Sequence, residues 1–131
     1  MIELSHEQIM NAAENLANRI KQRTETPLLY GVPRGGIPAA YAVMRFMPKA
    51  QVVDDVLDCT HIIDDLVDSG KTRTKYFAMF PEKRFEALFD KSRIKGHEQT
   101  WFVFPWEESE DGSADDIPIR LLQLIGEDPN R

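Results

Sequence analysis

The sequence predicts an α/β domain in which a mostly parallel sheet is flanked by helices. A short apolar run is followed by a glycine-containing turn and then a helical pattern twice, at residues 27–46 and at residues 61–80. Apolar runs that alternate with helices are typical of parallel strands joined by crossover helices. The composition agrees, because 42% of the 131 residues are hydrophobic and 29% are charged, as in a globular domain.

Charge, cysteine content and hydropathy limit the functions to consider. The net charge is −6 and no basic patch stands out, which argues against nucleic acid as a partner. No apolar run is long enough to span a membrane, and no signal-peptide pattern follows Met1. The single cysteine, Cys59, rules out an internal disulfide and favours a reducing compartment, so we expect a cytoplasmic protein.

An N-terminal helix is expected from Ser5 to about Lys21. Ser5 and Gln8 have the spacing of a capping box, in which each side chain bonds to the backbone N–H of the other residue. Apolar residues recur on one face at helical spacing: Ile9, Ala12, Ala13, Leu16 and Ile20. We assign this helix to packing and to no chemistry.

The first strand–turn–helix unit contains a loop suited to an anion. Residues 27–32 are expected to form a buried strand, and residues 37–46 an apolar helix. Arg34 in the turn is a fixed cation that can bind two phosphate oxygens at once. Gly35 and Gly36 let backbone N–H groups approach a ligand.

The next connection is unusually short. Residues 50–53 are expected to form a second strand, and only residues 54–60 separate it from the following one. A parallel neighbour requires the chain to return to the starting edge of the sheet. Seven residues reach at most roughly 25 Å when extended, which carries the chain back along a strand with nothing to spare.

Residues 61–72 are the stretch around which the chain is organised. A buried strand with the paired acids Asp64 and Asp65 is expected to lead into a tight loop, and a helix to begin at Lys71. A helix N-terminus suits a phosphate, because its backbone N–H groups are free and the helix dipole is positive there. The loop adds a third acid, two hydroxyls and a glycine: Asp68, Ser69, Gly70 and Thr72.

The paired acids and the phosphate donors together indicate a phosphorylated sugar as ligand. Asp64 and Asp65 can accept hydrogen bonds from sugar hydroxyls or hold Mg²⁺, but they repel a phosphate. The Gly70-Lys71-Thr72 sequence is also found in nucleoside-triphosphatase loops. Those loops need a glycine five positions earlier, where this chain has Asp65, so we set that interpretation aside.

The remainder of the chain supplies aromatic and basic residues. A helix is expected from Lys71 to about Phe80 with Tyr76, Phe77 and Phe80 in the core, and Pro81 ends it. Residues 85–89 alternate like a strand, and Lys91 just beyond it is expected on the ligand side of a parallel sheet. Residues 100–107 include Trp101, Phe102 and Trp106, whose rings suit a buried strand or a platform for planar bases.

Residues 61–72 resemble the phosphoribosyl diphosphate (PRPP) signature of the type I phosphoribosyltransferases. The loop with Arg34, Gly35 and Gly36 is similar to the pyrophosphate loop of the purine-salvage members, and residues 101–107 to the segment that lines their base pocket. The chain is most like the bacterial xanthine-guanine (6-oxopurine) enzymes. The resemblance runs from about Leu28 to Glu107 and implies a Rossmann-like phosphoribosyltransferase domain at residues 1–107. Because residues 54–60 hold no insertion, the hood that closes over PRPP is expected to be truncated or missing.

The resemblance implies transfer of ribose 5-phosphate from PRPP to guanine, xanthine or hypoxanthine, with release of pyrophosphate. It implies Mg²⁺ as cofactor, held by Asp64 and Asp65, and a homodimer. Asp68 would accept a proton near the purine N7, and Arg34 would stabilise the leaving pyrophosphate. PRPP would be bound by Arg34, Gly35, Gly36, Asp64, Asp65, Asp68, Ser69, Gly70, Lys71 and Thr72, and the base by Lys91, Trp101 and Phe102. Val103 stands where the xanthine-guanine enzymes have an acid, so the preferred base is left open.

Two further functions stay under consideration. One is a non-catalytic PRPP- or nucleotide-binding module that regulates a fused or partner enzyme. Residues 108–131 are expected to form an acidic linker and a C-terminal helix with a tail, and residues 121–131 resemble the start of GTP cyclohydrolase I. The other is a pyrimidine-salvage enzyme, against which Lys91 and the aromatic block at Trp101 argue.

Overall fold

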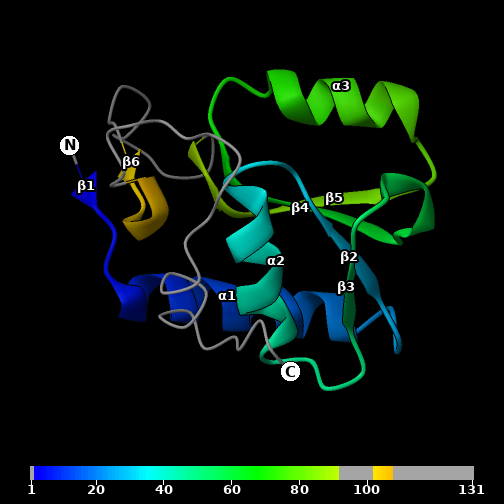
Figure 1. Cartoon of the computed structure of the whole chain (residues 1–131), viewed down its shortest axis with the longest axis horizontal. Helices are drawn as coiled ribbons and strands as arrows, with labels where there is room; N and C mark the ends of the chain where they lie inside the picture. Colours follow the sequence, from blue (N-terminus) through cyan, green and yellow to red (C-terminus); the bar gives the residue numbers. More distant parts are fainter. Residues whose placement is uncertain (1, 92–101, 108–131) are drawn as a thin grey trace.

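A four-stranded parallel sheet forms the centre of the molecule (Figure 1). The computed structural model describes residues 2–91 and 102–107. The strands are β2 (Leu28–Gly31), β3 (Gln51–Val53), β4 (His61–Val67) and β5 (Arg84–Asp90), in the order β3-β2-β4-β5. All three pairings are parallel, which confirms the predicted α/β fold class.

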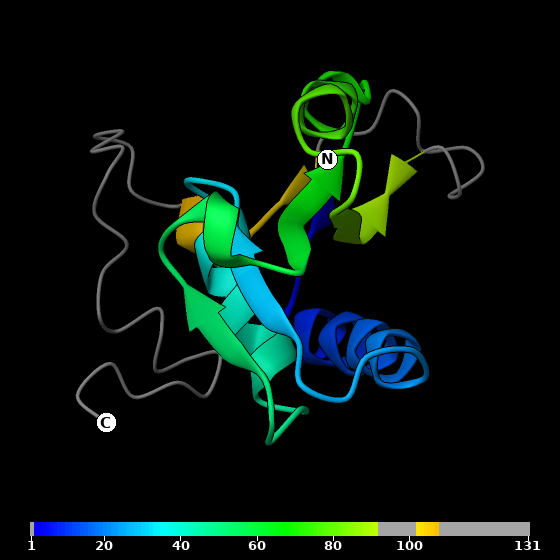
Figure 2. The same cartoon turned by 90° about the vertical axis from the view of Figure 1, so that its right-hand side faces the viewer.

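Helices cover both faces of this sheet. Helices α1 (His6–Lys21) and α2 (Gly36–Met44) pack against each other on one face, where α2 contacts β2 and β4 and α1 contacts β5. Helix α3 (Lys71–Met79) lies on the opposite face against β5. Figure 2 shows α3 above the sheet and α1 below it.

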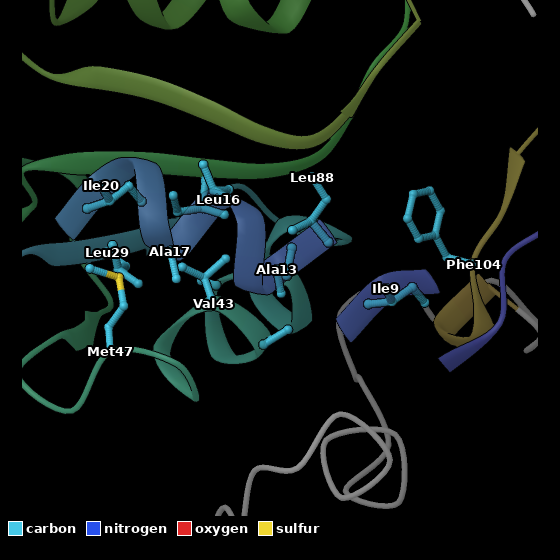
Figure 3. Packing of buried hydrophobic residues seen from close by; sticks show 14 of the residues in the cluster. Ile9, Ala13, Leu16, Ala17, Ile20, Leu29, Val43, Met47, Leu88 and Phe104 are labelled. Carbon is cyan, nitrogen blue, oxygen red and sulfur yellow. The ribbon is translucent and has the colours of Figure 1, made fainter. Parts of the chain in front are cut away.

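The main core lies between the sheet and the helices α1 and α2. The predicted capping box is present, because the Gln8 N–H donates to Ser5 Oγ at 3.1 Å and the Ser5 N–H donates to Gln8 Oε1 at 2.8 Å. The apolar face of α1 then meets α2 and the sheet (Figure 3). Burying each large aliphatic side chain contributes about 1.5–3 kcal/mol. The fully or almost fully buried members include Ile9, Leu16, Ile20, Leu29, Val43 and Ile63.

A second, very small sheet joins the first residues of the chain to the last described ones. Strand β1 (Ile2–Glu3) pairs in parallel with β6 (Phe102–Val103), and the Leu4 N–H donates to the Val103 carbonyl at 2.9 Å. A short 3₁₀ turn, Pro105–Glu107, follows β6. The N-terminal residues therefore hold the aromatic segment 102–107 beside the main sheet.

The short connection between β3 and β4 is possible because β3 has only three residues. Val53 at the end of β3 pairs with Tyr30, and His61 at the start of β4 pairs with Leu29. The chain thus returns by only one position along β2 while it crosses to the other side of that strand. Residues 54–60 contain a single 3₁₀ turn, Val56–Asp58, in agreement with the predicted truncation of the hood.

One predicted core residue of α3 lies outside the core. Phe77 is 64% exposed, whereas Tyr76 and Phe80 are half-buried and pack against the small cluster of Val32, Cys59 and Ile62. Successive helical residues point about 100° apart, so positions 76 and 80 face the sheet and position 77 turns away from it. The prediction for Phe77 was wrong because a helix lying alone on this face buries one narrow stripe.

In the part of the chain that the structure describes, no helix combines the length and the apolar character needed to cross a bilayer.

Candidate active site

The two strand–turn–helix loops meet at one edge of the sheet. From β2 the chain proceeds to β3 on one side, and from β4 it proceeds to β5 on the other. The connections that leave the carboxyl ends of β2 and β4 therefore diverge, and ligands of open parallel sheets bind in the crevice that this reversal creates. Both predicted phosphate loops, residues 32–36 and 68–70, start at this point.

The loop after β2 is packed tightly against β4. The Val32 N–H donates to the Ile63 carbonyl and the Gly36 N–H to the Val32 carbonyl, each at 2.8 Å. A Cβ at Gly36 would lie 2.5 Å from the Ile63 carbonyl oxygen, so a side chain does not fit there. The peptide bond between Pro33 and Arg34 is cis, and Arg34 is exposed at the tip of the loop.

The loop after β4 forms a small hollow at the start of α3. Gly70 has φ +85°, a left-handed conformation that favours glycine, and α3 begins at Lys71 as predicted. The first backbone N–H groups of a helix have no partner within it, so they are available to an anion. The hollow has a volume of about 80 Å³ and is lined by residues 68–73 together with Asp64.

The paired acids are close enough to share a proton. Asp64 is 8% exposed, and the Asp65 N–H donates to its Oδ1 at 2.9 Å. Burial, then the charge of Asp65 and a hydrogen bond between the two carboxyl groups, raises the pKa of Asp64 to about 8. A cation at this pair would replace that proton.

The donor set fits Mg²⁺ only in combination with a substrate. Among the described residues no group of three or more His, Cys, Asp or Glu side chains is arranged to hold a metal ion. Asp64 and Asp65 can offer two carboxylates, and Mg²⁺ is commonly bound by one or two carboxylates plus substrate oxygens and water. The pair therefore fits a metal ion that arrives with a polyphosphate.

Asp65 connects the two loops to the aromatic segment. Its carboxylate lies against Gly35, where a Cβ would overlap it. The Trp106 indole N–H donates to Asp65 Oδ2 at an N···O distance of 3.4 Å. The second acid of the pair thus has neighbours on both sides of the crevice.

Three predicted site residues from distant parts of the chain come together at the carboxyl end of β5. Lys91 is 6% exposed, and its Nζ lies 3.0 Å from Asp68 Oδ1. The same Nζ lies 5.8 Å from the centre of the Phe102 ring. A buried lysine beside an aromatic ring and a half-exposed carboxylate can hydrogen-bond a planar, polar ligand at two of its edges.

The architecture of the chain is similar to that of solved purine phosphoribosyltransferases. No protein-family profile matches the chain. A purine phosphoribosyltransferase from Pyrococcus horikoshii superposes with a TM-score of 0.58 and 21% sequence identity, covering 82% of this chain and 94% of that one. The xanthine-guanine-hypoxanthine phosphoribosyltransferase of Helicobacter pylori superposes with a TM-score of 0.59 and 20% identity, covering 82% of this chain and 93% of that one. The chain has the type I phosphoribosyltransferase fold.

Similarity in sequence is confined to part of the chain. It is 40% identical over 55 residues to a xanthine-guanine phosphoribosyltransferase of Roseobacter denitrificans and 35% identical over 69 residues to one of a Ruegeria species. These matches cover 35% and 46% of this chain, and they span only 31% and 39% of the two relatives. The sequence similarity is therefore partial, and what the solved structures add is the shared fold.

Some parts of the chain with predicted roles lie outside the residues that the structure describes. Trp101, predicted to stack on the base, is one of them. Residues 108–131 also lie outside, so the linker, the C-terminal helix and the cyclohydrolase-like segment stay predictions. Ser69, Lys71 and Thr72 are described and exposed at the phosphate loop, and the Lys71 N–H donates to Ser69 Oγ at 3.3 Å.

Sequence reasoning missed two residues of the site. Arg73 lines the hollow at the start of α3, and its Nη1 lies 3.1 Å from Asp90 Oδ2. The sequence could have indicated Arg73, because it is a basic residue in the first helical turn after a predicted anion-binding loop. Trp106 was expected only as a member of the aromatic block at residues 100–107, and nothing local connects it to an aspartate 41 positions earlier.

Proposed function

We propose that the chain is a purine phosphoribosyltransferase that transfers ribose 5-phosphate from PRPP to a 6-oxopurine and releases pyrophosphate. The supporting observation is that Lys91 Nζ lies beside both Asp68 and the Phe102 ring, next to the predicted phosphate loop. A base bound there lies next to a sugar whose 5′-phosphate occupies the start of α3. The names of the partial sequence relatives support the same reaction.

In this proposal the phosphate loop and the acids hold the donor. Ser69, Gly70, Lys71 and Thr72 bind the 5′-phosphate through the N–H groups and hydroxyls at the start of α3. Asp64 and Asp65 accept hydrogen bonds from the ribose hydroxyls. When Mg²⁺ is bound, it neutralises charge on the pyrophosphate.

The remaining residues act on the two reacting groups. As the bond from C1′ to the pyrophosphate oxygen breaks, negative charge grows on the leaving group, and Arg34 with the Gly35 and Gly36 backbone stabilises it. Lys91 donates to the 6-oxo group, which orients the base, and Phe102 and Trp101 flank its ring. Asp68 accepts a proton from the purine as the new bond from nitrogen to C1′ forms.

Further parts of the proposal concern the setting of the reaction. We place it in the cytoplasm, since the single Cys59 is a free thiol. We infer a homodimer, because Leu57, Phe77 and Met79 are large apolar side chains that are 68%, 64% and 55% exposed. Nucleic acid and membranes have no part in the proposal.

A second candidate function is a non-catalytic PRPP-binding module. It is favoured by the connection at residues 54–60, which is short and pinned, because Lys83 Nζ donates to the Leu57 and Cys59 carbonyls at 3.2 and 2.6 Å. A segment held in this way cannot close over the site, and closure is what excludes water in many transferases.

Turnover separates the two candidates. Pyrophosphate release from Mg-PRPP is measured with guanine, xanthine, hypoxanthine, adenine or uracil in turn. If the chain is a transferase, pyrophosphate release should depend on a 6-oxopurine. It should fall at least about 100-fold in Asp64→Asn/Asp65→Asn, because the two carboxylates that bind PRPP are lost. Glu14→Gln, an exposed and isosteric change on α1, is the matched control and keeps full activity. Saturable PRPP binding in calorimetry without release would leave the binding module, and turnover of uracil alone would favour pyrimidine salvage.

A further inference from the structure

The two acids of β4 are held in different ways. Asp64 is buried and receives the backbone N–H of Asp65. The Asp65 side chain is half-buried and reaches towards Gly35, with Oδ2 as the oxygen nearest to the position of a Cβ there. The same Oδ2 accepts the indole N–H of Trp106. Its rotamer is therefore limited by a backbone on one side and a donor on the other.

Trp106 is itself fixed by aromatic packing. Its ring stacks on Phe104, with centroids 4.9 Å apart and planes 20° apart. Phe104 is 1% exposed and belongs to the main core, and Trp106 is 8% exposed. The preceding residues are strand β6, which β1 holds in place. The indole N–H is thus presented from a rigid support.

A purely structural role for Trp106 leaves one fact unexplained. Ring packing on Phe104 needs the apolar area of the indole, and a phenylalanine also supplies such area. A buried indole N–H, however, usually finds an acceptor, and here the acceptor is a carboxylate of the crevice. A hydrogen bond to a charged group contributes more than one between neutral groups, so this contact restrains Asp65 even at its long N···O distance.

We propose that Trp106 is a positioning residue of the PRPP site, acting through Asp65. By holding Oδ2 against Gly35, it sets the place of the second carboxylate relative to Asp64 before the donor arrives. The pair then meets the ribose hydroxyls and Mg²⁺ with less rearrangement. This inference rests on the proposed function for its consequence in PRPP binding, but the contact itself is testable without PRPP.

The first test compares the Trp106 indole ¹H–¹⁵N signal of the free wild-type protein with that of Asp65→Ala at one fixed pH. The chain has two tryptophans, and Trp101→Phe assigns the signals. A hydrogen bond to Asp65 moves the indole proton downfield and slows its exchange with water, so in Asp65→Ala the signal should move upfield and the proton should exchange faster. An indole proton with the same chemical shift and exchange rate in both proteins overturns the proposal.

The second test measures Mg-PRPP affinity by calorimetry together with thermal unfolding. Trp106→Phe keeps a ring on Phe104 and removes the N–H, so PRPP affinity should fall about fivefold, as for the loss of one modest hydrogen bond to a charge. The melting temperature should change little. Phe80→Leu is the control: it loosens the cluster beneath α3, lowers the melting temperature and leaves PRPP affinity unchanged. An affinity equal to that of the wild type in Trp106→Phe, or a loss that only follows the melting temperature, contradicts the proposal.

The two tests also separate this inference from the proposed function. A wild-type protein that binds no PRPP contradicts the proposed function, while the indole comparison still decides whether Trp106 is hydrogen-bonded to Asp65. If PRPP binds and the indole signal does not depend on the Asp65 side chain, the proposed transferase function is retained and the positioning role of Trp106 is rejected. Because the indole comparison uses the wild type and Asp65→Ala, it decides the matter even if Trp106→Phe does not fold.

Discussion

The two loops of the crevice both place a glycine just before or at the start of a helix, yet each needs it for a different reason. Gly36 has no room, because a Cβ would lie 2.5 Å from the Ile63 carbonyl oxygen. Gly70 has ample room, since the nearest atom to its Cβ position is Arg73 Nη2 at 3.8 Å, but its φ is +85°. The loop after β2 is thus packed against β4 at Gly36, whereas the loop after β4 is an open turn that needs a left-handed backbone at Gly70. Substitutions should therefore damage them in different ways.

Gly36→Ala should have the largest effect. The new methyl group meets backbone atoms of β4, which cannot move without disturbing the sheet, so the free energy of unfolding should fall by about 3 kcal/mol. Urea denaturation monitored by circular dichroism measures it. A loss below about 1 kcal/mol would mean that the loop gives way easily and that the two loops are alike.

Asp64 lies between the two loops, and its proton should make stability depend on pH. Its pKa is raised to about 8 in the folded protein, against about 3.9 in an unfolded chain. The folded state therefore binds the extra proton between these values, and this contribution is fully present below about pH 4 and lost as the pH rises through 8.

Thermal unfolding of wild type and Asp64→Asn from pH 4 to pH 9 tests this. The wild type should lose stability relative to the variant as the pH rises. Burial, and after it the charge of Arg84, lowers the pKa of His61, which acts in the opposite direction below about pH 6.5, but it is common to both proteins and cancels in the difference. A difference curve without slope would show that Asp64 is ionised throughout this range.

Gly70→Ala should cost less, about 1–2 kcal/mol, because only the left-handed backbone opposes it. Gly70→Asn should recover part of that loss, since asparagine tolerates this conformation better than alanine. The corresponding Gly36→Asn should recover nothing. The same denaturation series compares the four variants, and a rescue at position 36 would break the distinction between the loops.

Phe77→Ser should have the smallest effect on the protomer. Phe77 is 64% exposed on α3, so its replacement should change the free energy of unfolding by no more than about 0.5 kcal/mol at low protein concentration. Phe80→Ala, on the face towards the sheet, should be clearly more damaging. Equal losses of unfolding free energy in the two variants would show that both rings are buried and that α3 contacts the sheet over a broader face.

Features with local chemistry were predictable from the sequence. The start of α3 at Lys71 and the capping box at Ser5 depend on neighbouring residues, and both were found as expected. Lys91 was expected on the ligand side because parallel strands bring their carboxyl ends to one edge, and its Nζ lies 3.0 Å from Asp68 Oδ1, a contact that was not predicted.

Contacts between residues that are far apart in the sequence were not predictable. The Asp65–Trp106 contact joins residues that no pattern relates, and the pairing of β1 with β6 involves strands of two residues, too short to leave a periodic signal. The connection at residues 54–60 looked barely sufficient because the length of β3 was not known. Once β3 ends at Val53, opposite Tyr30, the chain has little distance to return.

The pairing of β1 with β6 has a consequence for how the site comes into being. It joins Ile2 to Phe102, so it closes a loop that contains nearly every other described element. Contacts of such long range form late, because the entropy of closing the loop opposes them until the intervening structure exists. Both loops of the crevice can thus be in place before Trp106 arrives beside Asp65. The orientation of that acid then becomes a final event of folding, sensitive to anything that delays the docking of the first few residues.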